Sequence, residues 1–236
     1  MAALRCDVAC KCWRAEAVPE MGWDQIWDSR GILLIGLENT VWLSVLSIVT
    51  ASIVGLIVGL LRTARLPILG PLLRVYLEVF RGSPLLIQML FIYFGSAYLG
   101  FSGVSAFSAA LLALTLYEGA LVSEIFRAGI EAVPRGQRDA ARSLGLSRLS
   151  IQRDVILPQT VPIVLPPLVG QYIGLVKDTA LATIVGYAEL VREGQAIVDR
   201  IAMPIQVFLV VAGIYFVICY PMSLVARRLE KRAIHV

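Results

Sequence analysis

The chain has 236 residues, of which 58% are hydrophobic and only 16% are charged, and its mean hydropathy is +0.79. Soluble globular domains usually carry about 25% charged residues. This composition excludes an ordinary soluble enzyme, a disordered tail and a nucleic-acid-binding module. We interpret the net charge of +4 first as a marker of membrane topology, because basic residues gather in the cytoplasmic loops of membrane proteins.

Long stretches of the chain contain no charged residue at all. About 20 apolar residues in a helix span a hydrocarbon core of ~30 Å. The charge-free stretch 82–117 is too long for one crossing, and the small and polar residues at 95–103 predict a turn within it. The sequence therefore predicts an all-α, polytopic membrane protein. Its five transmembrane helices are expected at 39–61, 72–96, 104–127, 154–176 and 203–226.

Both ends of the chain are predicted to be tails, over residues 1–30 and 229–236. The first tail is either disordered or an over-called start, with Met21 as the true first residue. Its charged residues leave no apolar core for a signal peptide. It also holds Cys6, Cys10 and Cys12, but the only histidine is His235, so the spacing matches no zinc site and no metal is expected.

The basic residues are unequally distributed between the two predicted sides of the membrane. Thirteen of the 21 lie in the loop after the first span, in the connection 127–153 and after the last span. The positive-inside rule places these segments in the cytoplasm. The N-terminus is then outside and the C-terminus is cytoplasmic, as an odd number of spans requires.

A short helix is predicted in the cytoplasmic connection, over residues 136–145. Good helix formers follow Pro134, and Gly145 suits the left-handed position just past a helix end. The alanines on one face allow close backbone approach, which suits insertion into a groove on another protein. A helix lying on the membrane is the alternative, although this face has little lipid affinity. The residues singled out are Asp139, Ala140, Ala141, Arg142, Leu144 and Gly145.

The fourth span contains prolines at intervals of four residues, Pro158, Pro162 and Pro166. Each proline removes a backbone donor. Either the span has a simple packing kink, or it is a broken helix that lines a transport path. We favour the broken helix, because Gly170 and Gly174 follow the prolines.

Three polar side chains lie deep in the predicted spans: Gln88, Glu118 and Gln171. Polar groups inside a bilayer are costly and usually serve packing pairs or a pathway. An amino-acid zwitterion needs an acceptor for its ammonium and donors for its carboxylate, and these groups supply both. Leu85 and Gly174 are expected to wall the same cavity. The alternative for Glu118 is a structural pair between helices.

A short Glu-x-Phe-Arg pattern occurs twice, as Glu78-Val-Phe-Arg81 and Glu124-Ile-Phe-Arg127. Residues three apart on a helix can pair, so local neutralisation is one interpretation. Cross-pairing between the spans, through Glu78 and Arg127, is the other.

The motif Asp139-Ala-Ala-x-x-x-Gly145, followed by Val155-x-Leu157-Pro158, resembles the EAA loop of ABC importer permeases. Arg81-Gly-Ser-Pro-Leu-Leu-Ile-Gln88, Val133-Pro-Arg-Gly-Gln137 and Lys177-Asp-Thr-Ala-Leu181 are similar to the polar amino-acid subfamily, which includes histidine, glutamine and glutamate importers. The resemblance covers residues 31–228, the expected permease domain. It implies that 136–145 is a coupling helix and that Lys177 and Asp178 anchor or gate the fourth span. Relatives often have Asn-Glu at Gly170-Gln171, which weakens the case for a strictly cationic substrate.

The resemblance also implies partners and a location. Such permeases pair with a second permease, identical or related, and assemble with two ATPase subunits and a solute-binding protein in the bacterial inner membrane. Lys11, Lys177 and Lys231 are the only lysines, and none follows a glycine, so the chain has no phosphate-binding loop. We therefore expect no enzyme activity and no cofactor on this chain, with ATP acting on the partner.

Two other classes of membrane protein compete with this interpretation. A self-sufficient secondary transporter or channel is the main alternative, but five spans without an evident inverted repeat leave its midplane site unfinished. A membrane-embedded enzyme lacks a credible nucleophile–base pair.

Overall fold

The structure, a computed structural model, describes residues 23–63, 67–101 and 103–233, and these residues form helices and connecting loops with no strand. The elements are α1 (Trp23–Asp28), α2 (Arg30–Thr63), α3 (Leu69–Gly82), α4 (Leu85–Tyr98), α5 (Ala106–Ala132), α6 (Arg135–Ser143), α7 (Arg148–Ser150), a π-helical segment η1 (Ile151–Ile156), α8 (Leu157–Asp178), a 3₁₀ segment η2 (Thr179–Val185), α9 (Leu190–Ile201) and α10 (Pro204–Ala233).

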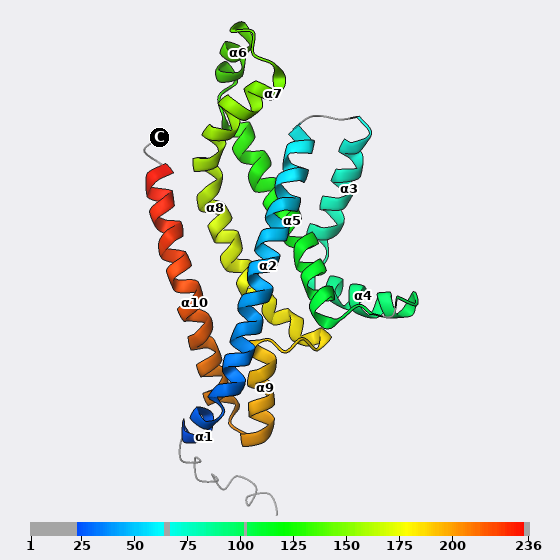
Figure 1. The fold of residues 1–236 in the computed structure, drawn as a ribbon, viewed down its shortest axis with the longest axis vertical. Coiled ribbons are helices and arrows are strands. Elements are labelled where there is room, and N and C mark those ends of the chain that lie inside the picture. Colours follow the sequence, from blue (N-terminus) through cyan, green and yellow to red (C-terminus); the bar gives the residue numbers. More distant parts are fainter. Residues whose placement is uncertain (1–22, 64–66, 102, 234–236) are drawn as a thin grey trace, which may run out of the picture.

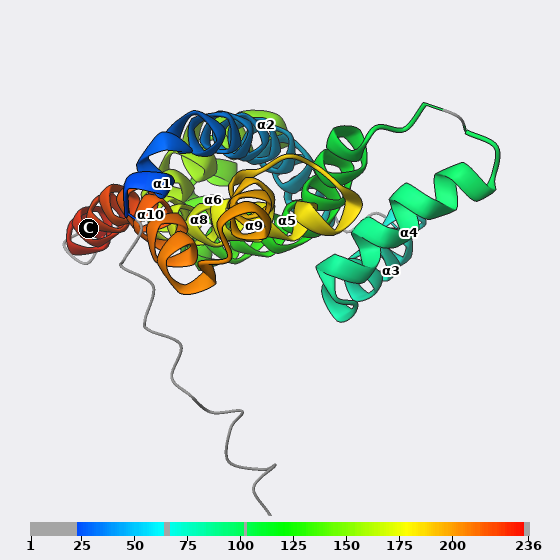
Figure 2. The same cartoon turned by 90° about the horizontal axis from the view of Figure 1, so that it is seen from below.

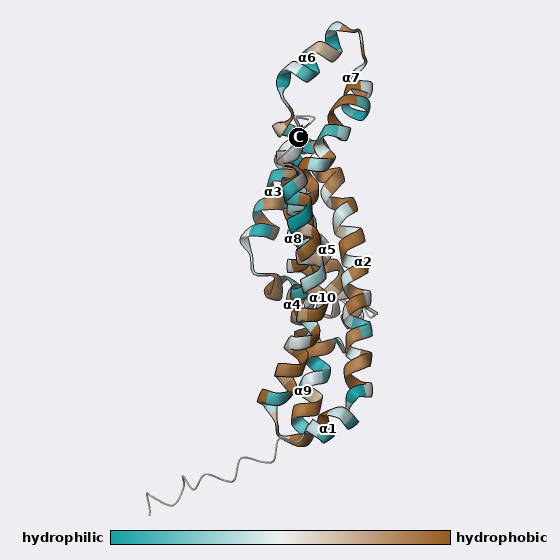
Figure 3. Ribbon diagram, turned by 90° about the vertical axis from the view of Figure 1, so that its left-hand side faces the viewer, coloured by the Kyte–Doolittle hydropathy of each residue, from teal (hydrophilic) through white to brown (hydrophobic). Residues whose placement is uncertain are grey.

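The long helices α2, α5, α8 and α10 form an elongated bundle (Figure 1). The short helices α6 and α7 lie at the end where α10 finishes, whereas α1 and α9 lie at the opposite end. Hydrophobic residues predominate along α2, α8 and α10, and α6 is largely hydrophilic (Figure 3). The all-α membrane fold predicted from the charge-free stretches is thus confirmed.

Small residues bring α2 and α5 into close contact. A Cβ atom added at Gly55 would lie 2.4 Å from Cγ1 of Val122, closer than any real side chain can approach. Ala51, one turn earlier, is fully buried. Small residues at these positions therefore allow the two helices to pack closely.

The second predicted span is not one helix. It consists of α3 and α4, which meet at an angle of 105° across Ser83 and Pro84, so it counts as a fifth span only if the bent pair is one span. Proline restricts the residue before it to extended conformations, and Ser83 has φ −112° and ψ 147°. Seen from below, α3 and α4 stand to one side of the bundle (Figure 2).

The predicted break in the fourth span is wrong, because α8 is a continuous helix from Leu157 to Asp178. Pro158 is the second residue of α8, and the π-helical segment η1 directly precedes it within one continuous helical run from Arg148 to Val185. Pro162 and Pro166 lie inside the helix. Proline is accepted inside membrane helices because neighbouring groups satisfy the backbone carbonyls that it leaves without a hydrogen bond. Irregular geometry is found instead at both ends of α8, in η1 and η2.

The predicted N-terminal tail, residues 1–30, includes α1 and the first residue of α2. The three N-terminal cysteines, the start-site alternative at Met21 and His235 lie outside the described residues.

Candidate transport path and coupling helix

The short helix predicted at 136–145 is α6 (Arg135–Ser143), and it ends as the sequence predicts. Gly145 has φ +77°, the left-handed conformation that glycine adopts without a steric penalty. Its N–H group donates to the Arg142 carbonyl at 2.9 Å, and the Leu146 N–H donates to the Ala141 carbonyl at 3.2 Å. These two bonds form a Schellman motif, which satisfies carbonyl groups at the helix end.

The apolar residues of α6 do not share one docking face. Ala141 is buried in a cluster with side chains from α5 and η1, among them Ile130, Ile151 and Ile156. Ala140 is exposed and Leu144 is 81% exposed, so these two remain available to another protein. Ala141 therefore attaches the helix to the bundle, which corrects the single Ala–Ala–Leu face expected from the sequence.

The charged residues of α6 reinforce this arrangement. Arg138 donates to the Ile130 carbonyl at the end of α5, at 3.0 Å. Asp139 and Arg142 form an exposed ion pair of 3.5 Å, which contributes little to stability because water screens it. These two side chains also point away from the bundle's core and are free for a partner.

Two of the predicted substrate-path residues meet in the bundle. Gln171 of α8 donates from Nε2 to Oε2 of Glu118 of α5 at 2.8 Å, although the residues are 53 positions apart. Glu118 is fully buried, and its Oε1 has no hydrogen-bond partner in the described part of the chain. Asp178, at the end of α8, is close enough to influence Glu118 electrostatically. A buried carboxylate with one unsatisfied oxygen is a strong acceptor for an ammonium group.

The other predicted path residues lie elsewhere. Gln88 donates to the Phe80 carbonyl at 2.8 Å and to the carbonyl and hydroxyl of Ser83 at 3.0 and 2.9 Å. Its amide therefore holds the corner between α3 and α4. Leu85 is buried in a core cluster with Leu43, so it walls no cavity in this structure.

The remaining predicted residues are on the same helix as Gln171. Gly174 is partly buried, and no atom outside its own helix lies within 4 Å of an added Cβ. Lys177 is exposed and Asp178 is partly buried at the end of α8, so the pair is split between solvent and the bundle.

The repeated Glu-x-x-Arg pattern forms a charge cluster centred on Glu124. This carboxylate pairs with Arg62 of α2 at 2.5 Å, Arg127 of its own helix at 2.8 Å and Arg81 of α3 at 3.4 Å. The spans do cross-pair, but through Arg81 and Glu124, so the pairing expected between Glu78 and Arg127 is wrong. The pair between Arg62 and Glu124, which joins α2 to α5, has no counterpart in the sequence pattern because the two residues are 62 positions apart.

A bundle of membrane-length helices, with a buried Glu118–Gln171 pair inside it and a short helix beyond one end, is consistent with a membrane transport protein. Residues 51–235 match the family described as the binding-protein-dependent transport system inner membrane component, and the chain belongs to this family. The resemblance to ABC importer permeases inferred from the sequence is thereby confirmed.

Similar proteins support this assignment. The chain is 36% identical over 215 residues to the glutamine transport system permease protein GlnP of Escherichia coli strain K12, covering 90% of this chain and 98% of that protein. It is 38% identical over 212 residues to the probable glutamine ABC transporter permease protein GlnP of Bacillus subtilis strain 168, covering 88% and 93%.

A similar solved structure is that of an amino acid ABC transporter with histidines, with a TM-score of 0.81, 33% identity and coverage of 88% of this chain and 96% of that chain. A structure of the MetNI methionine ABC transporter, 22% identical with a TM-score of 0.74, shows the same fold.

Proposed function

We propose that this permease carries a polar amino acid of the glutamine class, and that Glu118 and Gln171 bind it. The observation that carries the proposal is the buried Oε1 of Glu118, which lacks a partner beside the amide of Gln171. An amino acid's ammonium group satisfies this oxygen. The relatives named for glutamine transport point to the same substrate class.

The permease works with partners that supply energy and substrate. ATPase subunits dock on α6 and hydrolyse ATP, because this chain has no phosphate-binding loop. A second permease, identical or related, completes the path. A solute-binding protein delivers the substrate at the end that carries α1 and α9.

In the proposed orientation, the protein lies in a bacterial inner membrane with its N-terminus outside and its C-terminus in the cytoplasm. The unequal distribution of basic residues supports it. The opposite placement of α1 and the end of α10 agrees with an odd number of crossings (Figure 1).

The geometry suggests how ATPase motion reaches the substrate. The cluster around Ala141 joins α6 to the end of α5 and to η1, which continues into α8. Glu118 is on α5 and Gln171 is on α8, so a shift of α6 changes the distance between the two binding groups. Alternating access then requires that the two bundle states differ in affinity for the two ATPase states.

Replacing Glu118 by Gln tests the proposed binding site. The variant keeps the side chain's shape but removes the charge that holds an ammonium group, so we expect at least a tenfold loss of substrate transport with normal expression. Uptake is measured in proteoliposomes with the ATPase and the binding protein. Glu131→Gln, an exposed position at the end of α5, is the matched control.

Equal losses of transport and expression in Glu118→Gln would contradict a binding role and favour a structural pair. Uptake driven by an ion gradient without the ATPase would contradict the importer mechanism itself.

A further inference from the structure

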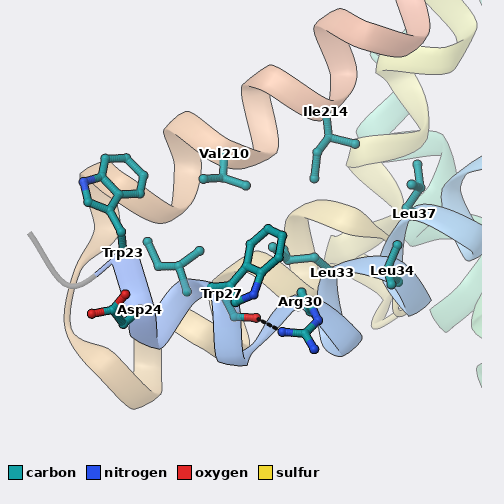
Figure 4. A pocket seen from close by; sticks show the side chains of 10 residues that line it. Trp23, Asp24, Trp27, Arg30, Leu33, Leu34, Leu37, Val210 and Ile214 are labelled. Atoms are coloured by element: carbon teal, nitrogen blue, oxygen red, sulfur yellow. Dashed lines mark hydrogen bonds between the residues drawn. The ribbon is translucent and has the colours of Figure 1, made fainter.

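A pocket lies between α1, the start of α2 and α10 (Figure 4), and none of its lining residues belongs to the proposed transport path. Its volume is about 610 Å³, within the range of ~300–1,000 Å³ typical of small-molecule sites. The floor consists of Leu33 and Leu37 of α2 and of Val210 and Ile214 of α10. This floor is wholly apolar, so it suits a hydrocarbon ligand.

The mouth of the pocket has a different chemistry. The Arg30 guanidinium lies 5.2 Å from the centre of the Trp27 ring, in a cation–π contact. Trp27 is 68% exposed, and Trp23 and Asp24 complete this side. Tryptophan rings are enriched where a membrane meets water. One cation and one anion therefore border an opening that is rich in aromatic groups.

The length of α2 places this mouth at the level of the lipid headgroups. Arg30 and Arg62 are 32 residues apart, about 48 Å along the helix and about 45 Å across a membrane at a typical tilt of ~20°. A bilayer with its headgroups is about 40–45 Å thick. With Arg62 at one headgroup layer, Arg30 lies at the other, on the side away from α6.

The surface around the pocket is suited to lipid. Leu34 and Ile35 on α2 and Ile205 and Leu209 on α10 are exposed large apolar side chains. Leu34 also lines the pocket, so the apolar lining reaches the surface of the bundle. A ligand lying in the pocket is therefore in contact with the hydrocarbon phase.

We propose that this pocket binds one phospholipid with a zwitterionic headgroup. An acyl chain lies on the apolar floor between α2 and α10. The phosphate binds Arg30, whose planar guanidinium suits phosphate oxygens, and the headgroup ammonium is attracted to Asp24. Phosphatidylethanolamine has this combination of charges, whereas phosphatidylglycerol offers Asp24 only a negative charge. The lipid holds α1 and α2 against α10.

Fluorescence quenching of Trp27 tests occupancy of the pocket. The full-length chain is purified in detergent with Trp13, Trp23 and Trp42 replaced by Phe, and phosphatidylethanolamine with brominated acyl chains is added. We expect saturable quenching with a midpoint that Arg30→Gln raises about tenfold, because a charged hydrogen bond is lost. Arg200→Gln, an exposed cation on α9 at the same end, is the control and should leave the midpoint unchanged.

Two further variants separate the chain site from the headgroup site. Ile214→Phe fills the floor and should abolish saturable quenching, while Asp24→Asn should remove the preference for phosphatidylethanolamine over phosphatidylglycerol. Native mass spectrometry of the assembled transporter should retain one phosphatidylethanolamine per copy of this chain.

Several results would overturn the proposal. They are quenching that rises linearly with the lipid-to-detergent ratio, equal effects of Arg30→Gln and Arg200→Gln, and equal midpoints for the two lipids. Absence of lipid in the assembled transporter would assign the pocket to a protein segment. None of these readouts depends on transport, so the lipid site and the proposed substrate can fail separately.

Discussion

Gly145 shows how one residue determines where and how α6 ends. Its φ of +77° is accessible to glycine, and its N–H group makes one of the two bonds that close α6. Nothing lies within 4 Å of an added Cβ, so the constraint at this position is the backbone conformation and not space.

Gly145→Pro should uncouple the transporter. Proline cannot adopt a positive φ and has no N–H group, so the helix end is lost and Leu144 moves away from the ATPase groove. We expect normal membrane insertion, with ATPase association and transport both reduced at least tenfold, measured by co-purification and by uptake. Gly136→Ala, at an open position on the same helix, serves as the control. Full association and transport in the proline variant would show that α6 is not the docking element.

At the scale of elements, α9 is held against the bundle by buried polar groups. Glu189 accepts from the N–H groups of Val191 and Arg192, both at 2.8 Å, and so caps the helix. Thr40 of α2 accepts from the Leu190 N–H at 3.0 Å. Tyr215 of α10 donates to Glu189 at 3.2 Å. The Glu189 carboxylate therefore connects α9 to α10, and the Thr40 hydroxyl connects it to α2.

The attachment of α9 should depend on pH. Burial raises the pKa of Glu189 above its ordinary value; the hydrogen bonds from Val191, Arg192 and Tyr215 oppose this, and the charge of Glu193 adds to it. A raised folded-state pKa gives stability that is complete below the unfolded-state pKa and is lost as the pH rises through the folded-state pKa.

Amide hydrogen exchange in α9 measures this effect. After correction for intrinsic rates, the free energy of local opening should fall as the pH rises above the ordinary range of a carboxyl group. Glu189→Gln cannot ionise and should show no such fall, while Glu193→Gln should still show it. An equal fall in both variants would mean that another group titrates.

The sequence was sufficient to predict elements whose physical cause is local. Charge-free stretches predict spans, and Gly145 predicts a helix end. Prolines were less informative, because Pro162 and Pro166 lie inside a continuous helix whereas Pro84 marks a 105° bend. At Pro84 the chain also has Gly82, an extended Ser83 and the Gln88 amide, which satisfies groups freed at the corner. Only the tertiary structure distinguishes these cases.

The candidate site was predicted in part for a related reason. Glu118 and Gln171 were recognised as costly in a bilayer, but their contact depends on how α5 and α8 cross. Gln88 is likewise a polar residue deep in a predicted span, but its amide holds the corner between α3 and α4. At α6, the two adjacent alanines have different surroundings, because Ala141 is buried in the cluster with α5 and η1 whereas Ala140 is exposed.

At the scale of the whole molecule, the two ends have different tasks. At one end, α6 is attached through Ala141 to α5 and η1, and α10 also finishes there. The other end carries α9, with its exposed polar side chains, and the lipid pocket. In the proposed mechanism, force enters at one end and substrate at the other, so the orientation in the membrane decides the direction of transport.

Cysteine labelling tests this orientation. In a chain with Cys6, Cys10 and Cys12 replaced by Ser, and Cys219 left buried, single cysteines are placed at Gln195 on α9 and at Glu230 near the end of α10. Both positions are exposed, and neither carries a positive charge that sets topology. A membrane-impermeant maleimide should label Gln195→Cys on intact spheroplasts, and Glu230→Cys only after permeabilisation. The reverse pattern would invert the proposed transport direction, and labelling of both from outside would contradict a membrane crossing by α10, since α9 and the end of α10 would then share one side.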